Sequence, residues 1–127
     1  MHSLTQRIYD LEARAAKFAS DVRVVVKTLS HNPYTIDDIR QVVRSSGSIG
    51  ANYIEANETL GRKDFLMHLR ISRKEAKESA YWLRILQGSA QGDFKDTLIR
   101  LFTEAKELER IFAAIIRNCM AKKPIAP

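Results

Sequence analysis

The spacing of apolar residues constrains the fold of this chain more than any other feature. From Leu4 to Leu29 and from Phe94 to Cys119, apolar residues recur every three or four positions. This spacing places one apolar stripe along an α-helix. The expected stripes are Leu4, Ile8, Leu11, Ala15, Phe18, Val22, Val25 and Leu29 in the first segment, and Phe94, Leu98, Leu101, Ala105, Leu108, Phe112, Ile115 and Cys119 in the last. No segment alternates with period two between turn residues, so we predict no strands.

Capping residues predict where the first two helices begin and end. Ser3 and Gln6 have the spacing of a capping box at the start of the first helix. The sequence His31-Asn32-Pro33 ends that helix, because proline and the residue before it disfavour helical geometry. Thr35, followed by Asp38, is then expected to be the N-cap of the second helix.

Glycine and aspartate predict the remaining boundaries. Gly61 is expected to end the second helix, and a third runs from about 62 to 87. Residues 88–92 form a short break, after which Asp93 and Asp96 begin the fourth helix. Four helices joined by short loops predict an all-α, antiparallel up-down-up-down four-helix bundle.

The chain length and composition fit one such domain. The 127 residues include 45% apolar and 28% charged side chains, and only five glycines and three prolines. We therefore expect a single domain over residues 1–123 and a frayed C-terminal tail over 124–127. No stretch approaches the roughly 20 apolar residues of a membrane span. The N-terminus lacks a signal-peptide pattern and Cys119 has no second cysteine to pair with, so we expect a reducing, cytoplasmic location and no membrane.

The run RSSGSIGANYIEANE, from Arg44 to Glu58, has the composition of a loop but the periodicity of a helix. Its predicted core line keeps the three-four spacing on both sides of the run: Ile39, Val43, Ser46, Gly50, Tyr53 and Asn57. The third helix has small residues at Ser72, Ala76, Ser79 and Ala80. We predict that the second helix is continuous and packs closely on the third, although each glycine costs up to about 1 kcal/mol of helix propensity. A KH-type clamp would need a sheet, and a Walker loop would need a following Gly-Lys-Ser/Thr.

Motifs between Ile36 and Leu86 resemble those of a bacterial family known as four-helix bundle proteins, or 23S ribosomal RNA intervening-sequence proteins. The motifs are Arg44-Ser-Ser-Gly-Ser-Ile49, Asn52-Tyr-Ile-Glu55-Ala, Lys63-Asp-Phe65 and Ile71-Ser-Arg-Lys-Glu75-Ala-Lys-Glu78-Ser-Ala-Tyr-Trp-Leu83. The resemblance implies a cytosolic antiparallel bundle that assembles into a ring-like pentamer, without established catalytic activity. Some members are encoded within inserts in ribosomal RNA genes. The accessory proteins of diversity-generating retroelements are similar in fold and pentameric, and bind nucleic acid and a reverse transcriptase.

The third helix carries more apolar residues than one core seam needs. The seam itself is predicted to use Phe65, Leu69, Ala76 and Leu83. A second apolar line is expected on another face, at Met67, Ile71, Tyr81, Trp82 and Ile85. A wide core stripe could bury these residues. We favour an interface between copies of the chain, because aromatic residues and methionine are enriched at interfaces.

The same helix carries a row of basic residues within a chain of net charge +6 and pI of about 9.7. Lys63, Arg70, Lys77 and Arg84 repeat every seven residues, with Arg62, Arg73 and Lys74 nearby. Such a row predicts sequence-independent contacts with RNA or DNA phosphates. The alternative is a solvated face whose charges are balanced by partners such as Glu78.

Two carboxylate pairs supply the enzyme hypothesis. Glu55 and Glu58, and Glu75 and Glu78, form ExxE pairs that could hold Mg²⁺ on adjacent helices, somewhat like the all-α nucleotide pyrophosphohydrolases of the MazG kind. The neighbouring glutamate usual there is missing, and Lys74 and Lys77 could neutralise the second pair. We favour structural hydrogen bonding by Glu55 and Glu75.

Other catalytic and metal patterns are weaker still. The histidines His2, His31 and His68 lack zinc-site spacing, and no Glu-x-x-His of a ferritin-type site occurs. We therefore expect no catalytic residues, metal or cofactor. The sequence favours a non-catalytic, oligomeric scaffold that binds RNA or DNA, and the resemblance implies a reverse transcriptase as a candidate partner. A purely structural protein-protein interaction module is the remaining alternative.

Overall fold

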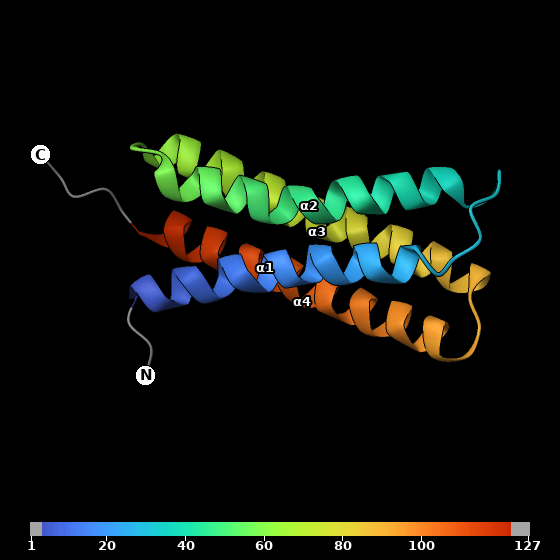
Figure 1. Cartoon of the computed structure of the whole chain (residues 1–127). Coiled ribbons are helices and arrows are strands. Elements are labelled where there is room, and N and C mark those ends of the chain that lie inside the picture. The colour runs from blue at the N-terminus through green and yellow to red at the C-terminus, as the bar shows by residue number, and fades with distance from the viewer. Residues whose placement is uncertain (1–3, 123–127) are drawn as a thin grey trace, which may run out of the picture.

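The computed structural model describes residues 4–122, with side chains from residue 10 onward, and forms an antiparallel four-helix bundle (Figure 1). Its elements are α1 (Leu4–Val26), α2 (Ile36–Glu58), α3 (Arg62–Leu86), the 3-10 turn η1 (Gln87–Ser89) and α4 (Gly92–Ala121). Residues 4–122 contain no strand. The all-α up-down-up-down prediction is therefore confirmed. Ser3 of the expected capping box and the expected tail at 124–127 lie outside the described residues.

The helix ends differ from the predictions in detail. The first helix ends at Val26, and Leu29 lies in the following turn, where it remains buried. Thr35 occupies the N-cap position of α2 without capping it, because its hydroxyl donates to the Ser30 carbonyl and accepts the Asn32 N–H at 3.1 Å. This threonine therefore fastens the α1–α2 loop and does not cap the helix.

The N-cap predicted for the fourth helix was also misplaced. Gln91 is at the N-cap position, and Asp93 lies in the first turn of the helix. Gly92 has φ of +57°, a conformation that favours glycine. The chain can therefore turn sharply from η1 into α4.

The core is built from the predicted stripes of α1 and α4 together with the inner faces of α2 and α3. Phe18, Leu83 and Phe112 are fully buried, and Tyr53 packs edge-on against Phe112 with ring centroids 5.5 Å apart. The expected stripe of α4 is wrong at its start, where Phe94 is 49% exposed. The side chains of Leu4 and Ile8 lie outside the described residues.

The run from Arg44 to Glu58 is helical throughout, as the periodicity predicts. The buried line of α2 nevertheless differs from the predicted one: Ile39, Val42, Ser45, Ser46, Ile49, Tyr53 and Ala56. Val43 and Gly50 are half-buried, and Asn57 is exposed. The reason is that α2 packs on both α1 and α3, so two adjacent stripes of the helix turn inward.

Small polar residues join α2 to α3 closely. The hydroxyls of Ser45 and Ser79 hydrogen-bond at 2.8 Å within the core. The Ser72 hydroxyl donates to the backbone carbonyl of Ile49, also at 2.8 Å. A side chain as short as serine can reach that carbonyl only when the two helices lie close together, so the predicted close packing of α2 on α3 is confirmed.

The glycines of the run face α1 and not α3, which corrects the prediction that they lie on the α2–α3 seam. A Cβ atom on Gly50 would lie 3.3 Å from the Cβ of Ala15. A Cβ on Gly47 would lie 3.1 Å from Nη2 of Arg23, which donates to the Val43 carbonyl at 3.1 Å. Ser45 of the motif therefore faces α3, whereas Ser46, Gly47 and Gly50 face α1.

Candidate nucleic-acid interface

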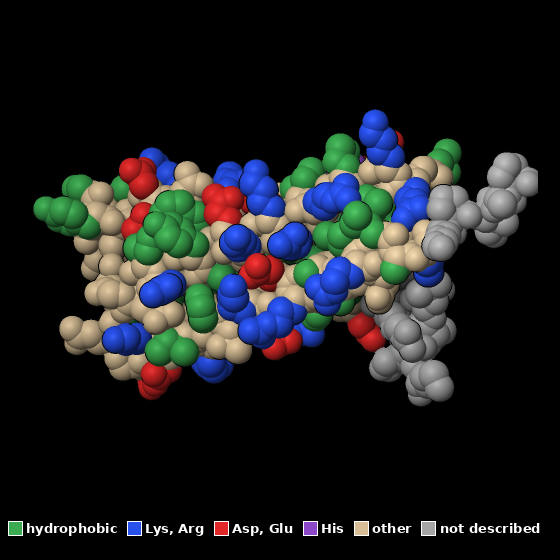
Figure 2. Space-filling model, turned by 180° about the vertical axis from the view of Figure 1, so that it is seen from behind, with side chains coloured by type: hydrophobic (Ala, Val, Ile, Leu, Met, Phe, Trp, Pro, Cys, Tyr) green, Lys and Arg blue, Asp and Glu red, His purple; other side chains and the backbone are tan. Residues whose placement is uncertain are grey.

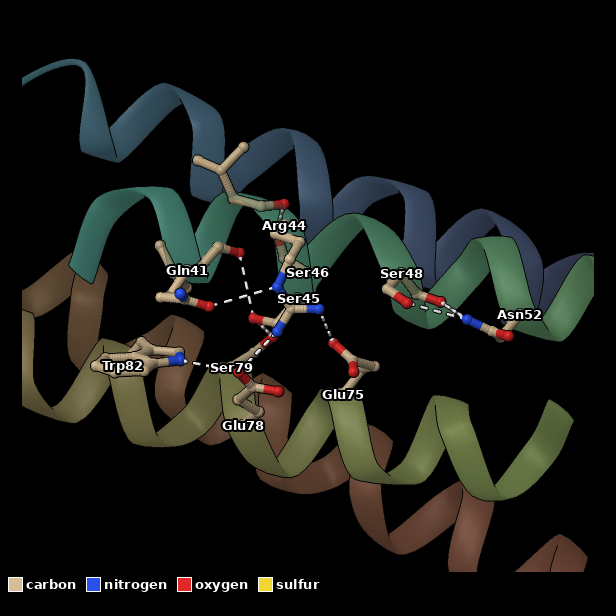
Figure 3. Close-up of polar contacts among 12 residues, drawn as sticks. Gln41, Arg44, Ser45, Ser46, Ser48, Asn52, Glu75, Glu78, Ser79 and Trp82 are labelled. Carbon is tan, nitrogen blue, oxygen red and sulfur yellow. Dashed lines mark hydrogen bonds and ion pairs between the residues drawn. The ribbon is translucent and has the colours of Figure 1, made fainter. Parts of the chain in front are cut away.

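An ion-pair network joins α2 to α3 on the protein surface (Figure 3). Arg44 donates from Nη1 to Oε2 of Glu75 at 2.9 Å and from Nη2 to Oε1 of Glu78 at 2.7 Å. The indole Nε1 of Trp82 donates to the same Glu78 oxygen at 3.3 Å. The side chain of Glu75 is only 7% exposed, so Arg44 supplies the counter-charge that this buried carboxylate needs.

The network shifts the pKa values of its members. Burial raises the pKa of Glu78, but hydrogen bonds from Arg44 and Trp82, with the charges of Arg44 and Lys74, outweigh burial and leave that pKa below its ordinary value. The hydrogen bond with Glu78 is the largest cause of the raised pKa of Arg44. Both groups are therefore charged at neutral pH. Neutralisation by Lys74 and Lys77, as the sequence suggested, is secondary to Arg44.

The two ExxE pairs do not converge. Hydrogen bonds between Ser45 and Ser79 and between Asn52 and His68 fix the antiparallel register of α2 and α3. In this register Glu55 lies about six to ten residues, or roughly 9–15 Å along the axis, from the level of Glu75. Among the residues that the structure describes, no three His, Cys, Asp or Glu side chains form a group suited to a metal ion. The arrangement required by the pyrophosphohydrolase hypothesis is therefore not formed.

The prediction that Glu55 and Glu75 form structural hydrogen bonds is correct for Glu75 only. Glu75 is buried and hydrogen-bonded, as predicted. Glu55 is exposed and forms no hydrogen bond or ion pair within the described part of the chain, so the prediction for it was wrong. The local pattern could not reveal Arg44 as the partner of Glu75, because it lies 31 residues away.

All seven predicted basic residues of α3 are exposed. They are Arg62, Lys63, Arg70, Arg73, Lys74, Lys77 and Arg84. None of them forms an ion pair with a carboxylate among residues 10–122. Arg62 instead donates to the Cys119 carbonyl at 2.7 Å, and Arg70 reaches the sulfur of Met120 at 3.5 Å.

Outside α3, residues 10–122 contain twelve basic side chains, and half of them are paired. Six of them pair with carboxylates, namely Arg14, Lys17, Arg40, Arg44, Lys106 and Arg110. Glu78, the partner expected for the α3 row, is held by Arg44 and Trp82. Positive charge therefore remains concentrated on α3, where four of its cations surround one surface hollow: Arg70, Arg73, Lys74 and Lys77.

The second apolar line of α3 stays partly open to solvent. Tyr81 is 56% exposed, Met67 45% and Ile85 40%. Ile71 and Trp82 are half-buried, and Trp82 packs against the core and edge-on against Tyr81, with ring centroids 5.0 Å apart. We call Met67, Ile71, Tyr81, Trp82 and Ile85 the apolar ridge. Since much of the ridge is exposed, a wide core stripe does not account for it.

No helix within residues 4–122 is both long and apolar enough to cross a membrane.

Comparisons with known proteins agree with the fold. The model of a family described as 23S rRNA-intervening sequence protein matches residues 4–114. A search of curated proteins finds no match. Among solved structures, the chain is similar to the 1.70 Å crystal structure of a protein of unknown function from the S23 ribosomal protein family of Bacteroides thetaiotaomicron. The two are 28% identical with a TM-score of 0.74, and the match covers 84% of this chain and 98% of that one. Because the family model spans most of the sequence, this chain belongs to the 23S rRNA-intervening sequence protein family.

Proposed function

We propose that the protein is a non-catalytic cytoplasmic scaffold that assembles with copies of itself and binds RNA or DNA through the basic residues of α3. One observation carries the proposal. All seven cations of this helix are exposed and lack a carboxylate partner, whereas six of the twelve cations elsewhere in the described structure are paired. Unpaired surface cations at regular spacing are suited to phosphate contacts, which gain free energy by releasing counterions.

The spacing of the basic residues along α3 limits how many nucleic-acid phosphates one subunit can contact. Lys63, Arg70, Lys77 and Arg84 repeat every seven residues, which places them about 10 Å apart along the helix axis. One subunit offers about four to six phosphate contacts, which gives non-specific binding in the micromolar range or weaker at physiological salt. Phosphate contacts carry no sequence information, so specificity would come from nucleic-acid shape or from a protein partner.

Assembly would make this weak contact useful. The apolar ridge lies on the same helix as the basic row, and copies joined through the ridge would bring several rows together. Holding several sites along one polyanion adds about two orders of magnitude in affinity. The resemblance described above supports a pentamer and makes a reverse transcriptase a candidate protein partner.

The purely structural alternative rests on the apolar ridge alone. In that case the ridge would bind a protein, and the basic row would be a solvated face. Nucleic-acid binding experiments can distinguish the proposed function from this structural alternative. Removing cations from α3 weakens nucleic-acid binding only if the row forms part of the site.

A pair of charge-matched variants tests the proposal. The first variant replaces Arg70, Lys77 and Arg84 with Gln. The control replaces Lys17, Lys27 and Arg40 with Gln, which removes the same charge from exposed positions on other parts of the fold. Fluorescence anisotropy with a labelled duplex and a structured RNA should show at least tenfold weaker binding for the α3 variant only. Equal affinities for the two variants would contradict the proposal.

A further inference from the structure

A second row of basic residues lies on α4. Lys106, Arg110 and Arg117 are separated by four and seven residues, so they share one stripe of that helix. In Figure 1, α3 and α4 lie behind α2 and α1. Figure 2 views the molecule from behind and shows lysine and arginine side chains over this broad face, with few carboxylates among them.

Two contacts place the stripe on the α3 side of α4. Arg70 of α3 reaches the sulfur of Met120, which follows Arg117 by three residues and is therefore its neighbour on the helix surface. The opposite flank of α4 is marked by Glu104, which forms a two-bonded ion pair with Arg14 of α1, both distances being 2.7 Å. Arg117 thus borders the α3 row and not the α1 side.

Arg117 differs from the other two cations of its stripe. Lys106 pairs with Glu109 at 2.9 Å, and Arg110 pairs with Glu107 at 3.1 Å. Arg117 is exposed and has no carboxylate partner among residues 10–122. Arg117 therefore resembles the α3 cations in being unpaired. The sequence agrees, because no carboxylate lies three or four residues from Arg117, where the partners of Lys106 and Arg110 lie.

We infer that the nucleic-acid site spans α3 and α4, includes Arg117, and takes a double-stranded rather than a single-stranded nucleic acid. This inference rests on the proposed function. Packed helices lie about 8–10 Å apart, so the two rows are separated by about that distance. A single backbone can follow one row only. A duplex presents two backbones on either side of a groove, and the major groove of B-form DNA is about 12 Å wide.

Length and side-chain chemistry agree with a duplex. The 25 residues of α3 span about 37 Å, close to one turn of a duplex at about 34–36 Å. Proteins that bind single strands usually stack the bases on aromatic side chains. The exposed aromatic residue of α3, Tyr81, belongs to the apolar ridge and packs on Trp82. Among the described residues, Tyr81 is the one exposed aromatic side chain beside the α3 row, between Lys77 and Arg84, and a single side chain does not make a stacking platform.

The test compares a duplex of about two helical turns with its separated strands, as DNA and as RNA, by fluorescence anisotropy on the intact oligomer. The duplexes should bind at least tenfold more tightly than the strands. The Arg117→Gln variant should lower the slope of log affinity against log salt by about 0.9 per contacting subunit and weaken duplex binding roughly eightfold at about 0.1 M salt. Lys27→Gln, an exposed position in the turn that follows α1, is the control and should change neither.

The outcomes separate this inference from the proposed function. If Arg117→Gln binds duplexes as Lys27→Gln does, or if strands bind as tightly as duplexes, the two-helix duplex site is wrong. The proposed function would still stand if the α3 triple variant loses affinity for either form. If the triple variant binds both forms as the wild type does, both claims fail. Comparing the DNA and RNA arms shows which duplex the site prefers.

Discussion

Arg44 and Trp82 hydrogen-bond the same carboxylate oxygen of Glu78, from 2.7 Å and 3.3 Å respectively. Arg44 belongs to the serine- and glycine-rich run of α2, and Trp82 belongs to the apolar ridge of α3. Glu78 therefore connects the close helix packing to the surface proposed for assembly. Because Glu78 pairs with Arg44, it forms no ion pair with the basic residues of α3, and their positive charge is not neutralised.

We expect Arg44→Met to destabilise the protein by about 1–3 kcal/mol, because the buried carboxylate of Glu75 would lose its counter-charge. Urea unfolding would measure the change, with Arg40→Met as a control for an exposed pair. Adding Glu75→Gln to Arg44→Met should restore part of the loss. A stability within about 0.5 kcal/mol of wild type for the single variant would contradict the role assigned to Arg44.

We expect Gly50→Leu to destabilise the fold by about 1–3 kcal/mol, because even a Cβ atom there would lie 3.3 Å from the Cβ of Ala15. Gly50→Ala should fail to give the roughly 1 kcal/mol that alanine normally adds in a helix. Gly88→Leu is the control and should cost less stability, since a Cβ atom at Gly88 meets nothing within 4 Å. Thermal unfolding in which Gly50→Leu matched wild type would show that α1 and α2 are not closely packed.

Arg44 and Gly50 show which features of the structure the sequence could predict and which it could not. The three-four periodicity is local, so it correctly predicted all four helices, including a run with the composition of a loop. The side of α2 on which Gly50 lies depends on how three helices pack, and the spacing alone could not distinguish α1 from α3. Similarly, the exposed α3 row followed from helical period, whereas the pairing of Glu75 and Glu78 with Arg44 depended on the register between distant segments.

The lowered pKa of Glu78 predicts a loss of stability in acid. A carboxylate with a lowered folded-state pKa stabilises the fold above its unfolded value, about 4.3 for glutamate, and this contribution disappears as pH falls through the folded pKa. Urea unfolding between neutral pH and about pH 3 should therefore show a shallower pH dependence for Glu78→Gln than for wild type. Parallel curves for the two proteins would contradict the prediction.

We expect Ile85→Asp to dissociate the proposed oligomer while leaving the helices folded. Ile85 is 40% exposed on the apolar ridge, and a charge at this position would be costly to bury between two copies of the chain. Light scattering should give a lower mass than for wild type, with an unchanged circular dichroism spectrum. Val24→Asp on α1, at 65% exposure, is the control and should keep the wild-type mass. A wild-type protein that is monomeric at micromolar concentration would remove the assembly claim.

The central claim is that the unpaired cations of α3 bind nucleic-acid phosphates, and the salt dependence of duplex binding tests it most directly. Each phosphate contact contributes about 0.9 to the slope of log affinity against log salt, so replacing Arg70, Lys77 and Arg84 with Gln should reduce the slope by up to about 2.7 per contacting subunit. The mass measured by light scattering should stay that of wild type. If affinity and slope are both unchanged in this variant, the basic row of α3 is a solvated face and does not bind nucleic acid.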